Sequence, residues 1–439
     1  MRADSVTMST ARSDAGVDDV DHRRLYGKIA LRLSPILFLI FFFANIDRAN
    51  VGFAAAALRQ DLGFSNAAYG LGAGIFFLGY FLFEVPSNIA LQKVGAKVWF
   101  TRIVLTWGLA TFALAFVKDT TWFYILRFIV GAAEAGAAPG VMLYLSQWVP
   151  NSQRGRFNAL YWLSAPMAFV VSGPLSGLIL TRLNGTAGYA GWQWLFMIEG
   201  LITMIMAPVI LYGLANTIQD AKWLTPAEKR VAANNILDLN KSAHAHSYRD
   251  ALRQPVTLVS SLAYFTLLIG YYGIAFWLPQ LIKQSGVSDT MTIGWLSALP
   301  WLAAAIAVVF VGPLSDKAGW RGIVRTLSIA MTSIGFWMSA YFADRPGLSL
   351  LGLTVAAIGI LAASTVFWAN LAQIYIGPAA AVAFAVINSL GNLGGFVSPY
   401  MLGIVTDLTG SAVMGMYAIT CSMVISGILM IIAFGRSRT

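Results

Sequence analysis

Long apolar runs separated by short polar intervals fill almost the whole chain. A helix of about 20 apolar residues, rising about 1.5 Å per residue, spans the hydrocarbon core of a bilayer. The pattern therefore predicts an all-α membrane protein with twelve transmembrane helices. The predicted helices are at residues 32–57, 68–92, 99–117, 121–148, 157–182, 192–215, 256–284, 291–313, 321–342, 348–374, 380–406 and 411–435.

One polar interval is much longer than the others, and it divides the helices into two sets of six. Its first half, from Thr225, has the sequence of a capped amphipathic helix. The expected segments are a cytoplasmic N-terminal tail (1–31), a first six-helix bundle (32–215), a cytoplasmic linker (216–255), a second six-helix bundle (256–435) and a short cytoplasmic C-terminal end (436–439).

The composition agrees with a membrane location. Of the 439 residues, 58% are hydrophobic and 11% are charged, whereas soluble domains have about 25% charged residues. The net charge of +10 does not indicate a nucleic-acid partner, because most Lys and Arg residues fall on loops that share one side of the membrane. This positive-inside pattern places both termini in the cytoplasm. The N-terminal tail lacks the apolar run of a signal peptide.

Five ionisable side chains interrupt the apolar runs of the first half. They are Asp47, Arg48, Glu84, Arg127 and Glu134. A charged side chain at the bilayer centre costs about 2.5–3.5 kcal/mol on insertion scales, so five together oppose insertion by about 10 kcal/mol. A chain retains such residues when they pair with one another or line a wet cavity, which makes them the best candidates for function.

The positions of these residues along their helices predict which way their side chains face. Arg127 and Glu134 are seven positions apart, so they share a helix face and lie about 10 Å apart along the axis. Asp47 and Arg48 are adjacent, so their side chains diverge by about 100°. We expect one of them to face a cavity and the other to pair with a charge on helix 121–148. A purely structural role is the alternative for Arg48 and for the Arg127–Glu134 pair.

Tyr80 and Glu84 are four positions apart and line one face of their helix. Tyr80 is a candidate hydrogen-bond donor to substrate. Glu84 lies just before Pro86, and a proton role and a gate or packing contact are both open for it. Glu199 lies near the outer end of helix 192–215, where we interpret it as structural.

The second half has no ionisable residue deep in a helix, and its candidates are neutral. Ser364 and Trp368 are four positions apart, as are Asn388 and Asn392, so each pair lies on one helix face. We expect the first half to handle charge and protons, and the second half to set specificity by hydrogen bonds and aromatic contacts. Lipid contact is the alternative for any single aromatic residue. The candidate substrate-binding residues here are Ser364, Trp368, Asn370, Asn388 and Asn392.

The two halves repeat a loop. Lys93, Gly95 and Lys97 after the second helix match Lys317, Gly319 and Arg321 after the eighth at one constant offset. A six-plus-six repeat with a cytoplasmic linker is typical of transporters that rock two bundles around a central site. The predicted gating loop contains Gly312, Asp316, Gly319 and Arg321.

The loop from Gly312 to Arg321 resembles the signature of the major facilitator superfamily. More narrowly, residues 47–54, 70–88, 127–136 and 191–200 resemble the anion:cation symporter family, which takes up organic anions with protons. The resemblance covers about residues 30–435. One departure lies in the first-half loop, where Gln92 and Asn88 stand in the positions of Asp316 and Gly312, which weakens charge pairing there.

The resemblance implies that Arg127 binds an anionic substrate group and that Glu134 carries a proton. It implies proton-coupled symport of an organic carboxylate by alternating access, with a sugar acid, a tartrate-like acid or an aromatic acid as substrate. The alternatives are an organic anion exchanger or uniporter of the same fold, and, more remotely, a metabolite sensor that does not transport. Proton-coupling residues would be Asp47, Glu134 and Glu84, and first-half substrate residues Arg48, Arg127 and Tyr80.

Other chemistry finds no support in the sequence. It has no Walker loop for ATP, and no arrangement of residues suggests an enzyme or a cofactor. His244 and His246 lie in the polar linker, where a metal site is not expected. The expected partners are a small organic anion, protons and the lipid bilayer, with the protein a monomer in the plasma (bacterial inner) membrane.

Overall fold

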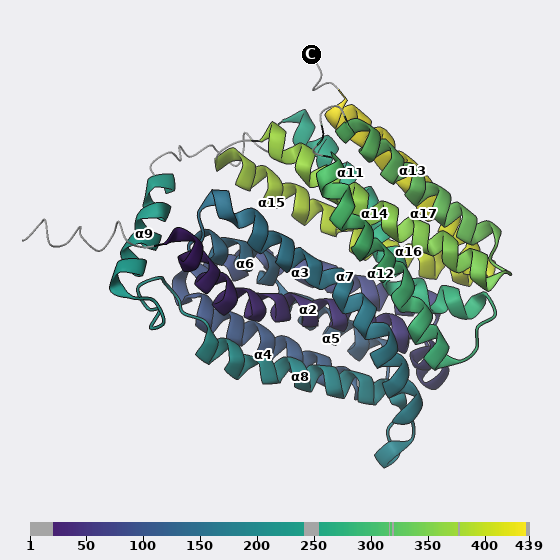
Figure 1. The fold of residues 1–439 in the computed structure, drawn as a ribbon. Coiled ribbons are helices and arrows are strands. Elements are labelled where there is room, and N and C mark those ends of the chain that lie inside the picture. The colour runs from purple at the N-terminus through teal and green to yellow at the C-terminus, as the bar shows by residue number, and fades with distance from the viewer. Residues whose placement is uncertain (1–20, 241–253, 316, 318–319, 376–377, 436–439) are drawn as a thin grey trace, which may run out of the picture.

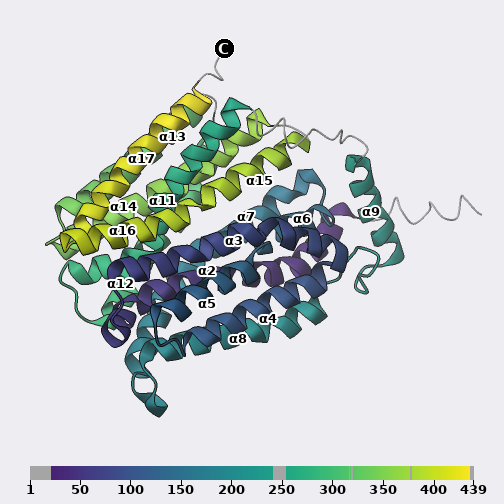
Figure 2. The ribbon, with the colours of Figure 1, turned by 180° about the vertical axis from the view of Figure 1, so that it is seen from behind.

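The computed structural model describes residues 21–240, 254–315, 317, 320–375 and 378–435, and all regular structure within these ranges is helical. The helices form two bundles that lie side by side (Figures 1 and 2). This arrangement confirms the predicted all-α fold. The first bundle contains α2 (His22–Leu62), α3 (Asn66–Val94), α4 (Ala96–Leu114), α5 (Thr120–Glu134), α6 (Ala137–Ser146), α7 (Asn151–Arg182), the 3-10 turn η1 (Thr186–Gly188) and α8 (Gly191–Gly213).

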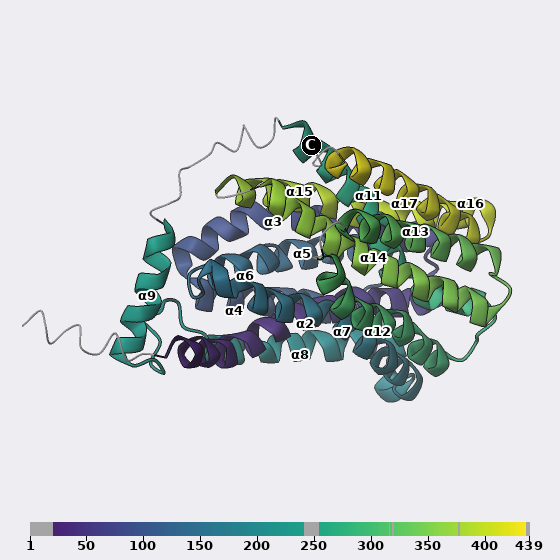
Figure 3. The same cartoon turned by 45° about the horizontal axis from the view of Figure 1, so that its top comes forward.

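The second bundle follows the linker helix α9 (Pro226–Asn240). In Figures 1 and 3, α9 lies at one end of the first bundle, and this end serves below as a reference. The helices of the second bundle are α11 (Pro255–Gln284), α12 (Thr290–Ser315), α13 (Trp320–Tyr341), α14 (Pro346–Ile374), α15 (Pro378–Asn392), α16 (Gly394–Thr409) and α17 (Ala412–Phe434).

Ten helices in the described part of the chain are long and apolar enough to cross a membrane, and they include α5 and α6 counted as one span. The other two predicted spans correspond to α4, which carries Lys97 and Arg102, and to the α15–α16 pair. Two of the predicted helices are interrupted in the structure. The predicted helix 121–148 breaks after Glu134, and the predicted helix 380–406 breaks near Leu393.

The first helix begins at His22, inside the segment expected to be a tail, because two features stabilise this turn. The side chain of Asp21 caps it by accepting the N–H of Arg23 at 2.8 Å. Leu25 and Ile29, one turn apart, are buried in the first bundle.

The two bundles meet most closely through α3 with α16, α7 with α12 and α2 with α11. Glycines make this approach possible. A Cβ on Gly74 would lie 2.6 Å from the carbonyl oxygen of Phe396, and one on Gly52 would lie 2.9 Å from that of Phe276. At the end away from α9, Asp407 accepts the N–H of Ala67 at 2.8 Å across the two bundles. The bundles are therefore in tight contact at that end.

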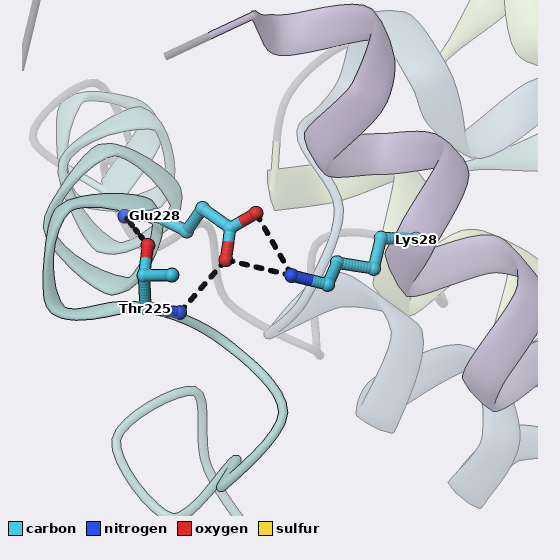
Figure 4. A network of polar contacts seen from close by, with 3 residues as sticks. All are labelled: Lys28, Thr225 and Glu228. Atoms are coloured by element: carbon cyan, nitrogen blue, oxygen red, sulfur yellow. Dashed lines mark hydrogen bonds and ion pairs between the residues drawn. The ribbon is translucent and has the colours of Figure 1, made fainter.

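The segment predicted as a capped amphipathic helix forms α9, and the structure shows that α9 packs on the first bundle. Figure 4 shows Glu228 accepting the N–H of Thr225 at 2.7 Å and lying 3.1 Å from the Nζ of Lys28 on α2. Burial alone would raise the pKa of Glu228, but the Thr225 N–H and the Lys28 ammonium lower it below its ordinary value. Further along α9, Asn235 donates to the hydroxyl of Tyr26 at 3.0 Å.

Candidate functional site

The centre of the site is an ion pair between Arg48 of α2 and Glu134 at the end of α5. Arg48 is 8% exposed and Glu134 is 1% exposed, so both charges are almost completely removed from water. The Arg48 guanidinium carbon also lies 5.3 Å from the centre of the Phe76 ring and 5.9 Å from that of Tyr80. One carboxylate oxygen of Glu134 has no hydrogen-bond partner among the described residues, which leaves it available.

A break in the backbone positions Glu134. The helix α5 ends there, Ala135 is extended, and Gly136 has a φ of 85° before α6 begins. This φ favours glycine. A Cβ on Gly136 would also lie 2.7 Å from the Cβ of Ser87 on α3, so the break requires glycine for space as well as for conformation.

Arg127 lies on the same helix as Glu134, and its guanidinium carbon is also close to Phe76, 5.0 Å from the ring centre. The side chain is fully buried. Its Nε and Nη2 donate to the carbonyls of Gly72 and Ala73 at 3.3 and 3.4 Å, long distances for hydrogen bonds. Its Nη1 has no partner among the described residues. Arg127 therefore keeps one donor that an anion can use.

Asp47 is not part of the Arg48–Glu134 ion pair. It is buried against Trp107 and Thr111 of α4, with Arg127 as its main electrostatic neighbour. Adjacent residues thus take different directions, and it is Arg48 that pairs with a charge of the predicted helix 121–148.

Glu84 joins the two bundles. Its Oε2 accepts the hydroxyl of Ser389 on α15 at 2.8 Å. Its neighbour one turn earlier, Tyr80, is buried beside Arg48. Figure 3 shows α15 passing close to α3. Ser389 has no distinguishing signal in the sequence and was missed; only the packing of α15 on α3 identifies it.

The neutral candidates of the second bundle separate into two groups. Asn392 accepts the hydroxyl of Tyr272 at 3.2 Å, and Tyr272 lies 4.4 Å from Phe77, measured between ring centres. Asn392 is therefore close to the bundle interface, as is the half-buried Asn388 one turn before it.

The other three candidates have partners in the second bundle. Trp368 packs edge-on against Tyr264, with ring centres 5.1 Å apart, and Ser364 is a polar neighbour of the same tyrosine. Asn370 donates to the carbonyl of Val366 in its own helix at 2.9 Å, which occupies part of its amide.

An aromatic cluster from both bundles lies near Arg48. Phe169 of α7 stacks on Trp301 of α12 at 4.2 Å between ring centres, and Tyr271 packs edge-on against Trp301 at 5.4 Å. Tyr271 and Tyr272 are electrostatic neighbours of Arg48. Phe169, Trp301 and Phe76 were not singled out in the sequence, because one aromatic residue among many has no signal before the helices are packed.

The predicted gating loop is only partly described. Asp316 and Gly319 lie outside the described residues, and Arg321 lies in the first turn of α13. The carbonyl of Gly312 accepts the hydroxyl of Ser315 at 2.8 Å. A Cβ on Gly312 would meet open space, so packing in this conformation does not require glycine there.

Comparisons with known proteins agree with this architecture. The family described as Major Facilitator Superfamily matches residues 37–399. A putative tartrate transporter of Agrobacterium vitis is 41% identical over 96% of this chain and 94% of its own. The putative metabolite transport protein NicT of Pseudomonas putida is 40% identical over 97% and 98%. The crystal structure of a D-xylose-proton symporter has a TM-score of 0.73 at 14% identity, over 91% of this chain and 97% of that one.

Proposed function

Because this chain belongs to the major facilitator superfamily and is a transporter rather than an enzyme, we propose that it carries a small organic carboxylate together with a proton by alternating access. It is an integral membrane protein with many apolar helices. The observation that supports the proposal is the buried Arg48–Glu134 pair, with Arg127 also close to the Phe76 ring.

The pair couples the anion to the proton through competition. A substrate carboxylate that binds Arg48 takes the place of Glu134 as its counter-ion. An unpaired carboxylate in a low-dielectric site costs several kcal/mol, so Glu134 then takes up a proton and becomes neutral. The anion and the proton therefore enter together, and the release of either favours the release of the other.

Arg127 supplies the second cationic contact through its free Nη1. When Arg127 turns toward the substrate, Asp47 loses its electrostatic partner and becomes a further place for a proton. Glu84, bonded to Ser389 across the interface, links the proton state to the contact between the bundles.

Alternating access fits the distribution of the contacts. The bundles are in tight contact at the end away from α9, through Gly74, Gly52 and Asp407. We propose that both termini are cytoplasmic, so that this end faces outward and the conformation corresponds to the outward-closed state of the cycle.

The substrate class is proposed from the relatives and from the site together. Two relatives bear the names putative tartrate transporter and putative metabolite transport protein. Two guanidinium groups and the Asn388–Asn392 face suit a hydroxylated acid of the tartrate or sugar-acid type. The cluster of Phe169, Tyr271 and Trp301 favours an aromatic acid as the second candidate.

Transport into proteoliposomes tests the proposal. Purified protein is reconstituted, an inwardly directed proton gradient is imposed, and the uptake of labelled tartrate, gluconate and benzoate is followed. Accumulation above equilibrium that a protonophore abolishes supports proton symport. Uptake only against a preloaded anion identifies an exchanger, and equilibration that ignores the gradient identifies a uniporter. Binding without any flux points to a sensor.

A further inference from the structure

The seam between the bundles, at the end away from α9, is a ladder of close contacts between α3 and α16, which run side by side (Figure 2). Asn66, Gly70 and Gly74 lie four positions apart on one face of α3. A Cβ on Gly70 would lie 2.2 Å from the carbonyl oxygen of Pro399, and one on Gly403 would lie 2.3 Å from that of Asn66. The two backbones are therefore in close contact up to the first turn of α3.

Asp407, in the last turn of α16, ends this ladder. Its Oδ1 accepts the backbone N–H of Asn66 at 3.0 Å, and its Oδ2 accepts that of Ala67 at 2.8 Å. The first N–H groups of a helix have no partner within that helix. The N–H of Ala68 donates to the N-cap residue Ser65 at 3.0 Å. Two of these three donors of α3 are therefore capped by the opposite bundle.

The side chain of Asn66 joins charges from two other helices. Its Nδ2 donates to Asp407 Oδ1 at 2.8 Å, and its Oδ1 accepts the Nη1 of Arg59 on α2. A guanidinium only donates and a carboxylate only accepts, so these two neighbours fix the orientation of the amide. Arg59 is also an electrostatic neighbour of Asp407. The helices α2, α3 and α16 are therefore linked at one point.

The position of Asp407 is unfavourable for its own helix. The C-terminal end of a helix carries partial negative charge, so a carboxylate in the last turn of α16 is repelled there, whereas the N-terminal end of α3 attracts it. Asp407 is exposed, so it contributes little to the packing of α16. Its hydrogen bonds to Asn66 and Ala67 run to the first bundle. The carboxylate therefore stabilises the contact between the bundles rather than α16.

We propose that Asp407 is the latch of the outer gate, which holds the two bundles together at this end by capping α3 from the opposite bundle. The inference rests on the proposed alternating access. Opening of the gate moves α16 off α3 and breaks the three hydrogen bonds to the carboxylate together. Water then solvates the freed groups, so the latch favours closure without preventing opening. Arg59 is a positioning residue, because it holds the Asn66 amide toward Asp407.

The test measures how often this end of the seam opens. Tyr69, one turn from Asn66 on α3, is fully buried and donates across the seam to the carbonyl of Phe276 at 3.0 Å. Tyr69→Cys places a reporter thiol there, in a Cys421→Ser background that removes the exposed native cysteine. A maleimide reacts with the buried thiol when the gate opens, so the rate follows the open fraction. All variants share this background and are labelled in lipid nanodiscs without substrate.

Asp407→Asn should increase the alkylation rate about tenfold, because the charge is lost and the new Nδ2 faces N–H donors. Asn66→Ala removes the amide link but keeps both backbone caps, so it should increase the rate only about threefold. The matched control is Asp289→Asn. Asp289 is also exposed, but it caps α12 within its own bundle, where it accepts the N–H of Thr292 at 2.7 Å. This control should leave the rate unchanged.

A rate in Asp407→Asn equal to that of the reporter background overturns the latch, as does an equal increase in Asp289→Asn. If Asp407→Asn does not fold, Asn66→Ala decides by the same criteria. Labelling needs no substrate, so the latch can fail while proton symport stands. Tartrate uptake that responds neither to a pH gradient nor to a preloaded anion overturns the proposed function instead, whatever the labelling rates.

Discussion

The substitution Glu134→Gln tests the competition between anion and carboxylate for Arg48. Removing one partner of a buried ion pair costs about 3–5 kcal/mol, because the other charge remains unpaired. The cation–π contacts of Arg48 with Phe76 and Tyr80 are already present in the wild type and offset nothing, whereas a hydrogen bond to the new amide recovers about 1 kcal/mol. The empty protein should thus lose about 2–4 kcal/mol, which a bound anion restores as the new counter-ion.

The variant should therefore bind substrate about 30–700 times more tightly than the wild type, since 1.4 kcal/mol is about tenfold. Isothermal titration calorimetry with tartrate measures this change, and affinity should become less dependent on pH. Gradient-driven accumulation in proteoliposomes should be abolished while exchange is partly retained. Glu228→Gln is the control for loss of an acid outside the site. Unchanged or weaker binding in Glu134→Gln, or normal accumulation against a gradient, would refute the reasoning.

Three further outcomes are expected. Arg127→Ala should reduce tartrate affinity at least about 100-fold in calorimetry, because a buried charged contact to the anion is lost; binding within twofold of wild type would contradict this. Gly74→Val should prevent closure at the end away from α9, since even a Cβ would lie 2.6 Å from the Phe396 carbonyl. Chemical labelling of a cysteine introduced at that end should therefore increase. Glu228, whose pKa is lowered in the folded protein, should stabilise the docking of α9 on α2 at pH values above the pKa that Glu228 has in the unfolded chain.

The pH dependence of the linker follows from the sign of that shift. The stabilisation from Glu228 is complete above the unfolded pKa and is lost as the pH falls through the lowered folded value. Because Lys28 is about half exposed, the contribution is below about 1 kcal/mol. Limited proteolysis with pepsin should cleave α9 faster as the pH falls in the wild type, and Glu228→Gln should show less of this dependence. An identical dependence in both proteins would assign it to other groups.

Apolar run length predicted the fold class because the bilayer sets the length of a spanning helix, and this constraint acts on each segment alone. The breaks after Glu134 and near Leu393 were not predicted, since the residues on either side remain apolar. At Gly136, the space for the break is limited by Ser87 on another helix, which leaves no room for a Cβ. A contact of this kind has no signature in the local sequence.

The candidate site, like the fold, could be predicted where local helix geometry decides and not where helix packing decides. The divergence of Asp47 and Arg48 follows from helix geometry, but which of them meets Glu134 depends on how α2 rotates against α5. Glu199 was interpreted as structural from its position near a helix end. Its unpartnered oxygens became visible only once α4 and α8 were packed together.

The anchoring of α9 has a consequence for how the chain can be divided. Its described contacts, through Lys28 and Tyr26, run to the bundle that precedes it. A cut placed after Asn240 would therefore leave the connecting helix as a permanent part of the N-terminal fragment. The N-terminal and C-terminal fragments would then share only the contacts between the bundles, such as the hydrogen bond from Ala67 to Asp407.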